Sequence, residues 1–216
     1  NVTPLVPRYL RYPIEERIDY KGDAITNLKK RDVLNAAKLF KKEGVEAIAI
    51  CFMNSFANKS HESLVAKMIR EQFPHAYLTV SSKFLPSIRF YDRISTTVLN
   101  SYVGPILKRY LTSLIKKLED IGFEGILLIM QSNGGVVSPK IAMDHAAVTL
   151  LSGPAAGPVA GIEYAAIQSY RDCLTIDMGG TSFDAALIKD KTPIVTTEGE
   201  IDRLRLALPM LGIVTI

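Results

Sequence analysis

Two apolar segments near the C-terminal end of the sequence are separated by only two glycines and a threonine. Residues 173–178 (CLTIDM) form the first segment, the link is Gly179-Gly180-Thr181, and SFDAALI forms the second. Segments of strand length with so short a link turn back on each other, so the pattern predicts a β-hairpin. Asp177 lies near the end of the first strand and Asp184 near the start of the second.

The glycine-rich link has the chemistry of an anion site. Glycines in a hairpin bend can adopt positive φ and let a bulky anion approach backbone N–H groups, and Thr181 and Ser182 add hydroxyl donors. Asp177 is then placed to hold Mg²⁺ through water or to orient an attacking water, with Asp184 assisting. The alternative is a plain hairpin in which an Asp caps the turn, and the residues of the link alone leave both interpretations open.

Charge and hydropathy exclude several classes of protein. Lys and Arg number 26 against 22 Asp and Glu, and this net charge of +4 is too weak and too scattered for a nucleic-acid-binding surface. No apolar run approaches the ~20 residues that span a bilayer, and we expect no signal peptide. We therefore expect a soluble cytoplasmic protein without nucleic-acid or membrane partners, in which Cys51 and Cys173 are buried, reduced thiols.

The N-terminal part of the sequence alternates between helix and strand patterns. Helical spacing over residues 26–42 is followed by the strand-like VEAIAICF, a second helix capped by Ser60, and the strand-like AYLTVSS. Residues 95–119 then predict a long helix that carries apolar residues at every fourth position and that Gly104-Pro105 should kink or divide. The run GILLIM predicts a strand covered on both faces.

Three further segments are candidates for ligand contacts. The loop Gln131-Ser132-Asn133-Gly134-Gly135 follows a predicted strand, at the end where open α/β sheets bind ligands, and it suits a phosphate or a polar substrate. Ser152-Gly153-Pro154 opens a helix of small residues whose N-terminus can face a phosphate. Arg89 and Arg93 share a face if their segment is helical, and there they can bind an anion.

Each of these segments also has an interpretation without a ligand. An Asn-Gly pair forms a tight turn by itself, and a helix of small residues can simply pack closely on a neighbouring element. The two arginines can form ion pairs with Asp92 and other acidic residues. The patterns alone leave these alternatives open.

Four motifs in order resemble the hydantoinase A and 5-oxoprolinase family, which belongs to the acetate and sugar kinase, Hsp70 and actin superfamily. They are RFYDRISTTVLNSYVGPI (residues 89–106), IMQSNGG (129–135), LSGPAAG (151–157) and DMGGTS (177–182). The resemblance implies an α/β fold with a ribonuclease-H-like mixed sheet, flanking helices and a β-hairpin phosphate motif. It also implies ATP and Mg²⁺ as cofactors.

The resemblance further implies an activity. Family members use ATP to activate and open a cyclic amide such as 5-oxoproline or a hydantoin, and relatives carboxylate ketones. They often work with a hydantoinase B-type subunit or domain. The alternative function is that of a non-catalytic lobe, which binds a partner and in which the hairpin has only a structural role. An ATPase sensor of the Hsp70 and actin kind shares the hairpin but does not account for IMQSNGG and LSGPAAG.

We expect the chain to be a segment of a longer protein. It begins at Asn1 and ends within the apolar run LGIVTI, and the family's second hairpin and later glycine-rich stretch are missing. Residues 1–85 are expected to form an αβ segment that joins an upstream domain. Residues 86–216 are expected to form the long helix and part of an actin-like lobe. Because superfamily members bind nucleotide between two lobes, we expect little or no ATP turnover by this chain alone.

Overall fold

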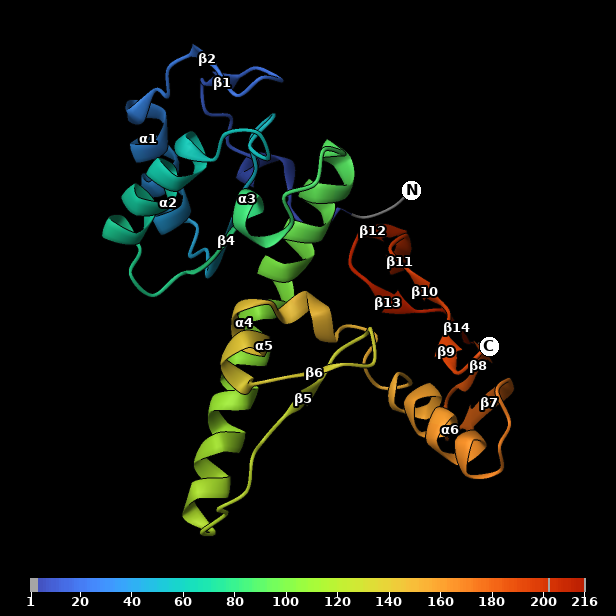
Figure 1. The fold of residues 1–216 in the computed structure, drawn as a ribbon. Helices are drawn as coiled ribbons and strands as arrows, with labels where there is room; N and C mark the ends of the chain where they lie inside the picture. The colour runs from blue at the N-terminus through green and yellow to red at the C-terminus, as the bar shows by residue number, and fades with distance from the viewer. Residues whose placement is uncertain (1–3, 202, 216) are drawn as a thin grey trace. The chain divides into compact units, whose positions relative to one another are not determined.

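The computed structural model describes residues 4–201 and 203–215, which fold into helices and small sheets (Figure 1). The described residues form two compact units. Unit 1 contains the chain up to Arg109 together with Ile201–Leu206, and unit 2 contains Tyr110–Glu200 and the chain from Ala207 onward. The predicted boundary between residues 85 and 86 lies within unit 1. It stays a prediction about the domains of the longer protein.

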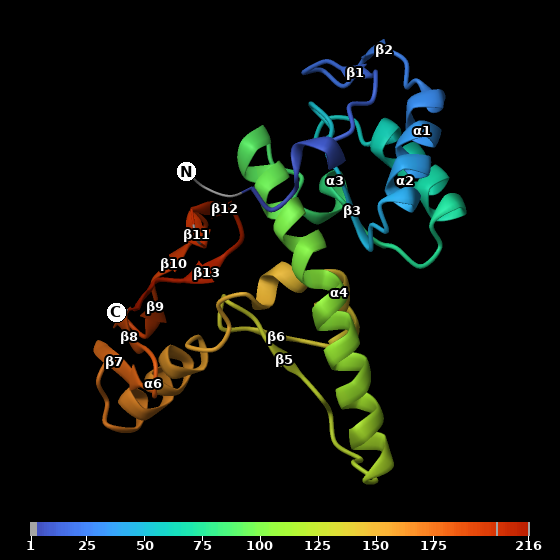
Figure 2. The same ribbon diagram turned by 180° about the vertical axis from the view of Figure 1, so that it is seen from behind.

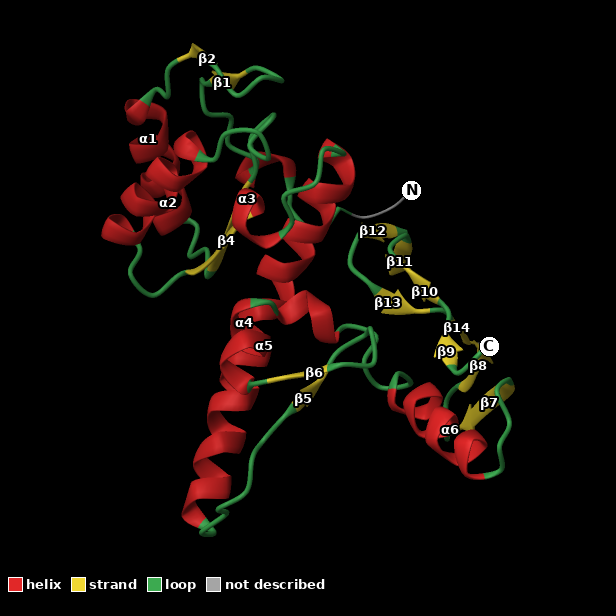
Figure 3. Cartoon of the chain, in the orientation of Figure 1, coloured by secondary structure: helices red, strands yellow, loops and turns green. Residues whose placement is uncertain are grey.

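Unit 1 has the predicted alternation of helices and strands. Its elements are the 3-10 helix η1 (Arg8–Leu10), β1 (Arg17–Ile18), β2 (Ala24–Thr26), α1 (Lys30–Lys42), β3 (Ala47–Ile50), α2 (Ser60–Gln72), β4 (Tyr77–Val80) and α3 (Ser81–Phe84). β1 and β2 pair antiparallel, whereas β3 and β4 pair parallel with Ile48 opposite Leu78. The secondary-structure colouring in Figure 3 shows helices next to this strand pair.

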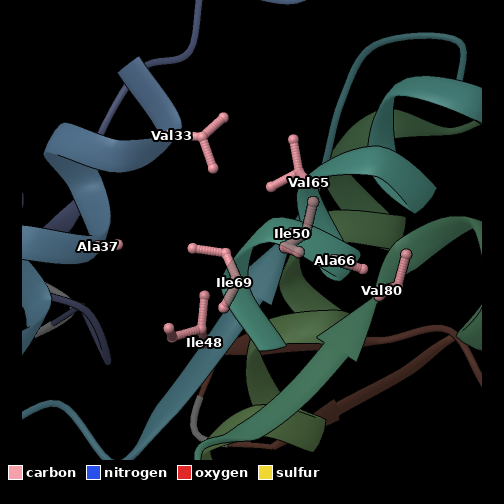
Figure 4. Packing of buried hydrophobic residues seen from close by; sticks show 8 residues of the cluster. All are labelled: Val33, Ala37, Ile48, Ile50, Val65, Ala66, Ile69 and Val80. Carbon is pink, nitrogen blue, oxygen red and sulfur yellow. The ribbon is translucent and has the colours of Figure 1, made fainter. Parts of the chain in front are cut away.

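The core of unit 1 lies between α1, α2 and the parallel strands. Figure 4 shows side chains from these elements gathered around Ile69, and the cluster consists of Val33, Ala37, Ile48, Ile50, Val65, Ala66, Ile69 and Val80. α1 buries Val33, Ala36 and Ala37 at helical spacing, which is the pattern that predicted the helix, and Val33 and Ala37 belong to this core. Ser60 is the first residue of α2 rather than its cap, because Lys59 occupies the cap position without a side-chain hydrogen bond.

The long helix α4 (Phe90–Asp120) differs from the prediction in two ways. It is not divided at Pro105 but runs through it as one helix, and the preceding Gly104 lets it approach the Tyr77 ring, which would lie 2.2 Å from an added Cβ. Tyr102 and Ile106, on the predicted apolar face, are exposed. The buried face is instead polar and hydrogen-bonded, since Asn100 donates to the Thr79 hydroxyl at 3.0 Å.

Unit 2 begins with a short antiparallel strand pair and two small helices. These are β5 (Ile129–Met130), β6 (Val136–Val137), α5 (Pro139–Asp144) and the 3-10 helix η2 (Ala146–Thr149). Ser138 caps α5 as predicted, because its side chain accepts a hydrogen bond from the Ile141 N–H. The prediction that GILLIM is a strand covered on both faces was wrong. Only its last two residues form a strand, and Ile126 is 84% exposed.

The rest of unit 2 is a helix packed on an antiparallel sheet, with smaller strand pairs beside it (Figure 2). The elements are α6 (Ala156–Ile167), β7 (Cys173–Met178), β8 (Phe183–Lys189), β9 (Thr192–Pro193), β10 (Val195–Thr196), β11 (Gly199–Ile201), β13 (Met210–Leu211) and β14 (Ile213–Thr215). The last residue of β11 and all of β12 (Leu204–Leu206) belong to unit 1. The main sheet has the order β14-β8-β7, and β9 also pairs with β8. The predicted α/β fold with flanking helices and a β-hairpin is confirmed.

No helix in the described ranges of the chain combines the length and the apolar character that crossing a membrane requires.

Candidate phosphate and metal site

The predicted hairpin is formed by β7 and β8. The strands pair antiparallel from Cys173 opposite Ile188 to Met178 opposite Phe183, and residues 179–182 close the turn. The Gly179 N–H donates to the Ser182 carbonyl at 3.0 Å within this turn. The N–H groups of Gly180, Thr181 and Ser182 donate to no other group that the structure describes. Three backbone donors at the tip of the hairpin are therefore available to a ligand.

The glycine pair is not explained by the backbone or by packing within the described chain. We expected positive φ in this bend, but neither Gly179 nor Gly180 has it. A Cβ added to either residue would meet nothing within 4 Å in the described structure. The absence of side chains here keeps the N–H groups open to a group outside the described chain, such as a phosphate.

Asp177 and Asp184 lie directly opposite each other on the two strands of the hairpin. Opposed like charges destabilise a strand pair unless a cation or fixed donors compensate them. The Asp184 carboxylate accepts hydrogen bonds from the Ser182 hydroxyl at 3.0 Å and from the Thr215 hydroxyl at 2.6 Å. Asp177 is exposed, and its carboxylate has no partner among the residues that the structure describes.

Helix α6 and the hairpin enclose a pocket of about 250 Å³ in unit 2. Its lining includes Gly157, Gly161 and Tyr164 from α6, together with Thr175, Asp177 and Asp184 from the hairpin. Gly161 allows the close approach of the helix, because an added Cβ would lie 2.1 Å from Thr175 Cγ2. The structure thus places both predicted carboxylates beside the helix of small residues.

The predicted start of this helix was wrong. Residues Ser152-Gly153-Pro154 form a turn, α6 begins at Ala156, and the cap position is occupied by Ala155 without a side-chain hydrogen bond. The Ala155 N–H bonds to the Ser152 carbonyl, so the chain is held in a turn before the helix. Ser152 and Gly153 do not line the pocket, whereas Pro154 does. A phosphate role of Ser152 and Gly153 stays a prediction.

The loop of residues Gln131, Ser132, Asn133, Gly134 and Gly135 is a tight turn. It follows the strand β5, as predicted, and closes the antiparallel pair β5–β6. Asn133 Oδ1 accepts a 2.8 Å hydrogen bond from the Gly135 N–H, and Gly134 has a φ of +81°. None of the five residues lines the pocket beside Asp177. Their predicted ligand contacts remain untested.

Ser132 has a structural role within this loop. Its hydroxyl donates to the Val148 carbonyl at 2.8 Å and accepts from the Leu151 N–H at 3.1 Å. Its own carbonyl accepts from the Leu211 N–H at 2.8 Å. Ser132 therefore ties the loop to two segments of unit 2, including the segment that leads into α6.

Arg89 and Arg93 do not present one shared anion-binding face. Arg93 is fully buried in unit 1, where its guanidinium donates to the Ser87 and Phe52 carbonyls at 2.6 Å each. Burial lowers the pKa of this guanidinium, and the charge of Glu62 opposes that shift. Arg89 precedes the helix, and its side chain is 71% exposed and lies 3.8 Å from Asp92. Arg93 is positioned to hold unit 1 together rather than to contact a ligand at the surface.

The hairpin residues fit a magnesium ion that keeps part of its water shell. No group of three or more His, Cys, Asp and Glu side chains suitable for a metal occurs in the described part of the chain. Mg²⁺ commonly binds through one or two carboxylates while waters and substrate phosphates complete its coordination. Asp177 supplies a free carboxylate, Asp184 a second one opposite, and the open N–H groups a place for phosphate.

Comparisons with known proteins identify the family of the chain. The hydantoinase/oxoprolinase family pattern matches residues 93–216, and the pattern of the hydantoinase/oxoprolinase N-terminal region matches residues 1–73. The chain belongs to the hydantoinase/oxoprolinase family.

Two relatives and one solved structure illustrate the match. The caprolactamase subunit alpha of Pseudomonas jessenii is 34% identical over 98% of this chain and 30% of its own length. The acetone carboxylase beta subunit of Xanthobacter autotrophicus is 27% identical over 97% of this chain and 29% of its own length. The crystal structure of the ATP-dependent caprolactamase from P. jessenii has a TM-score of 0.91 at 33% identity, covering 99% of this chain and 31% of that one. The chain thus spans about 30% of the length of these relatives.

Thr215 and Tyr164 are site residues that the sequence patterns did not indicate. Tyr164 lines the pocket from α6, and Thr215 bonds to Asp184 from β14. The helical pattern places Tyr164 on α6 but does not select it among the exposed residues there. Thr215 lies in an apolar run with no polar spacing, so only the pairing of β14 with β8 identifies it.

Proposed function

We propose that this chain is part of an ATP-dependent enzyme that opens a cyclic amide of the hydantoin or 5-oxoproline type, or that carboxylates a ketone. The observation that carries the proposal is the open glycine loop next to the opposed Asp177 and Asp184. Membership of the hydantoinase/oxoprolinase family and the likeness to an ATP-dependent caprolactamase support it.

In this proposal the hairpin binds the transferring phosphate. The N–H groups of Gly180, Thr181 and Ser182 donate to its oxygens, and the Thr181 hydroxyl adds a donor. Asp177 holds Mg²⁺ through water and Asp184 lies opposite as the second carboxylate. Ser182 contributes through its backbone, because its hydroxyl already donates to Asp184.

The chemistry explains why ATP is needed. A lactam carbonyl is a poor electrophile, and ATP would supply a phosphoryl group that makes the carbonyl carbon open to attack by water. The ring C–N bond then breaks, the amine leaves with a proton, and a second water hydrolyses the resulting acyl phosphate to carboxylate and phosphate. The donors of the hairpin stabilise the negative charge that develops on the phosphoryl oxygens. The pocket between α6 and the hairpin, with Tyr164 on its wall, is open to the reacting group.

The active protein is proposed to need further chain and a partner. The names of relatives include alpha, beta and gamma subunits, which supports a partner subunit, and we propose that this partner is of the hydantoinase B type. Two free cysteines, Cys51 and Cys173, support a reducing compartment such as the cytoplasm. The alternative of a non-catalytic partner-binding lobe predicts no nucleotide binding at the hairpin.

Turnover by the full-length protein with its partner subunit tests the proposal. ATP hydrolysis is followed with a lactam, a hydantoin, 5-oxoproline, and a ketone plus bicarbonate. Asp177→Asn should reduce kcat by at least about 100-fold because it removes electrostatic stabilisation of the transition state. Glu163→Gln is the matched control, since this exposed acid on α6 does not line the pocket.

Two results would contradict the proposal. One is ATP-independent turnover, or no turnover with any of the four substrate types. The other is an Asp177→Asn variant that is as active as the Glu163→Gln variant.

A further inference from the structure

The two facing carboxylates of the hairpin are held differently. Each oxygen of Asp184 accepts one hydroxyl hydrogen bond, Oδ2 from Ser182 at 3.0 Å and Oδ1 from Thr215 at 2.6 Å. Asp177 lies directly opposite and accepts none from the described residues. One carboxylate is therefore fixed in orientation, while the other is free to move toward a ligand.

The two donors come from different parts of unit 2. Ser182 lies in the turn of the same hairpin, whereas Thr215 lies on β14, where it pairs directly with Asp184. Directly paired residues of an antiparallel sheet share one face, so Thr215 Oγ1 reaches the carboxylate on the side of the pocket. Thr215 does not line the pocket itself, and any effect it has on a ligand acts through Asp184.

The fixed orientation of Asp184 affects cation binding, because its negative charge faces that of Asp177 and a cation can bind between two such charges. A carboxylate has about four lone-pair positions, and the two hydroxyls occupy only two of them. The remaining lone pairs then keep a constant direction, in which they would be available to a cation that also bound Asp177. Without the Thr215 hydroxyl, the carboxylate can rotate away, and a cation loses a preformed partner.

We propose that Thr215 is a positioning residue that sets the affinity of the hairpin for a divalent cation by orienting Asp184. This inference rests on the proposed function, which places Mg²⁺ at the same hairpin. The competing explanation is that Thr215 only stabilises the pairing of β14 with β8 as a cross-strand partner. The two explanations differ in what happens to cation binding when the hydroxyl alone is removed.

The test is a titration of the full-length protein with Mn²⁺ alone, in which electron paramagnetic resonance measures the free ion. Thr215→Val keeps the branched shape but removes the hydroxyl, and should weaken Mn²⁺ binding about 10-fold. Thr215→Ser keeps the hydroxyl and should bind Mn²⁺ within about twofold of wild type. Equal affinity of the Val variant and wild type, or equal losses in the Val and Ser variants, would overturn the proposal.

Two further variants separate failure of this inference from failure of the proposed function. If Asp177→Asn and Asp184→Asn lose Mn²⁺ but Thr215→Val does not, only the positioning role is wrong. If Asp177→Asn binds Mn²⁺ like wild type, the metal site of the proposed function is wrong as well. Adding Thr215→Val to Asp184→Asn should cause no further loss, because the hydroxyl acts through that carboxylate.

Thermal unfolding of each variant checks the fold. If Thr215→Val does not fold, Ser182→Ala removes the other hydroxyl from Asp184 without altering β14. It should then weaken Mn²⁺ binding in the same direction, and unchanged binding would count against orientation by these hydroxyls.

Discussion

Substituting Gly161 on α6 with Ala should destabilise unit 2 at the base of the proposed site. The added Cβ would lie 2.1 Å from Thr175 Cγ2 and 3.4 Å from Ile188 Cδ1. Thr175 cannot simply rotate away, because its hydroxyl donates to the Ala186 carbonyl at 3.3 Å. Overpacking of this kind costs about 1–3 kcal/mol. The better helix propensity of Ala returns about 1 kcal/mol, so the net loss is about 0–2 kcal/mol.

Gly157→Ala is the matched control on the same helix. A Cβ at Gly157 would meet nothing within 4 Å of the described residues, so only the helix-propensity gain applies. The difference between the two variants is then the overpacking cost alone. For a protein of this size, 1 kcal/mol shifts Tm by about 2–4 °C. Gly161→Ala should therefore melt at least about 2 °C below Gly157→Ala by far-ultraviolet circular dichroism. Equal melting temperatures would refute the close packing of α6 on β7.

Two further predictions concern other parts of the chain. Burial raises the pKa of the Cys51 thiol to about 12, with the charge of Glu62 adding to the effect. Both cysteines are half-buried rather than buried as expected, but the raised pKa keeps the Cys51 thiol protonated at pH 9. Cys51 should therefore resist iodoacetamide at pH 9 while Cys173 reacts, as mass spectrometry of the native protein can show; equal labelling would contradict this. The pKa of Cys51 in the folded protein lies above its unfolded value of 9.0, so the unfolded state loses the thiol proton first as pH rises. The contribution of Cys51 to the free energy of unfolding should therefore fall between about pH 9 and pH 12. Gly134→Ala should destabilise unit 2 by about 1–2 kcal/mol, since this residue has a φ of +81° and its Cβ would lie 3.0 Å from Val159; Gly153→Ala, at an open position, is the control in a urea titration.

The hairpin was predictable from the sequence because its signals are local. Strand patterns of period two and a short glycine link determine that β7 and β8 pair, and this pairing places Asp177 opposite Asp184. The reason for the glycines was not predictable. The expectation of positive φ was wrong. Only the structure shows that a Cβ at Gly179 or Gly180 would point into open space, where a ligand could bind.

Other features depend on contacts between distant segments. GILLIM has the apolar character of a buried strand, yet the described chain supplies a partner only for Ile129 and Met130. The polar face of α4 is buried because Arg93 and Asn100 find hydrogen-bond partners more than 20 residues away in sequence. Hydrophobic periodicity predicts that the apolar face of a helix is buried, so it wrongly places this polar face in solvent. Thr215 escaped prediction for a similar reason, since its partner lies on another strand.

The central claim is that the hairpin tip binds the phosphates of a nucleotide. Isothermal calorimetry of the full-length protein with ATP and Mg²⁺ tests it most directly, with Gly180→Val as the variant. The new side chain would point into open space, so the fold and Tm should be retained. The account predicts that Gly180→Val abolishes measurable ATP binding, with Gly180→Ala intermediate. A Gly180→Val protein that is folded and binds ATP as tightly as wild type would contradict the account.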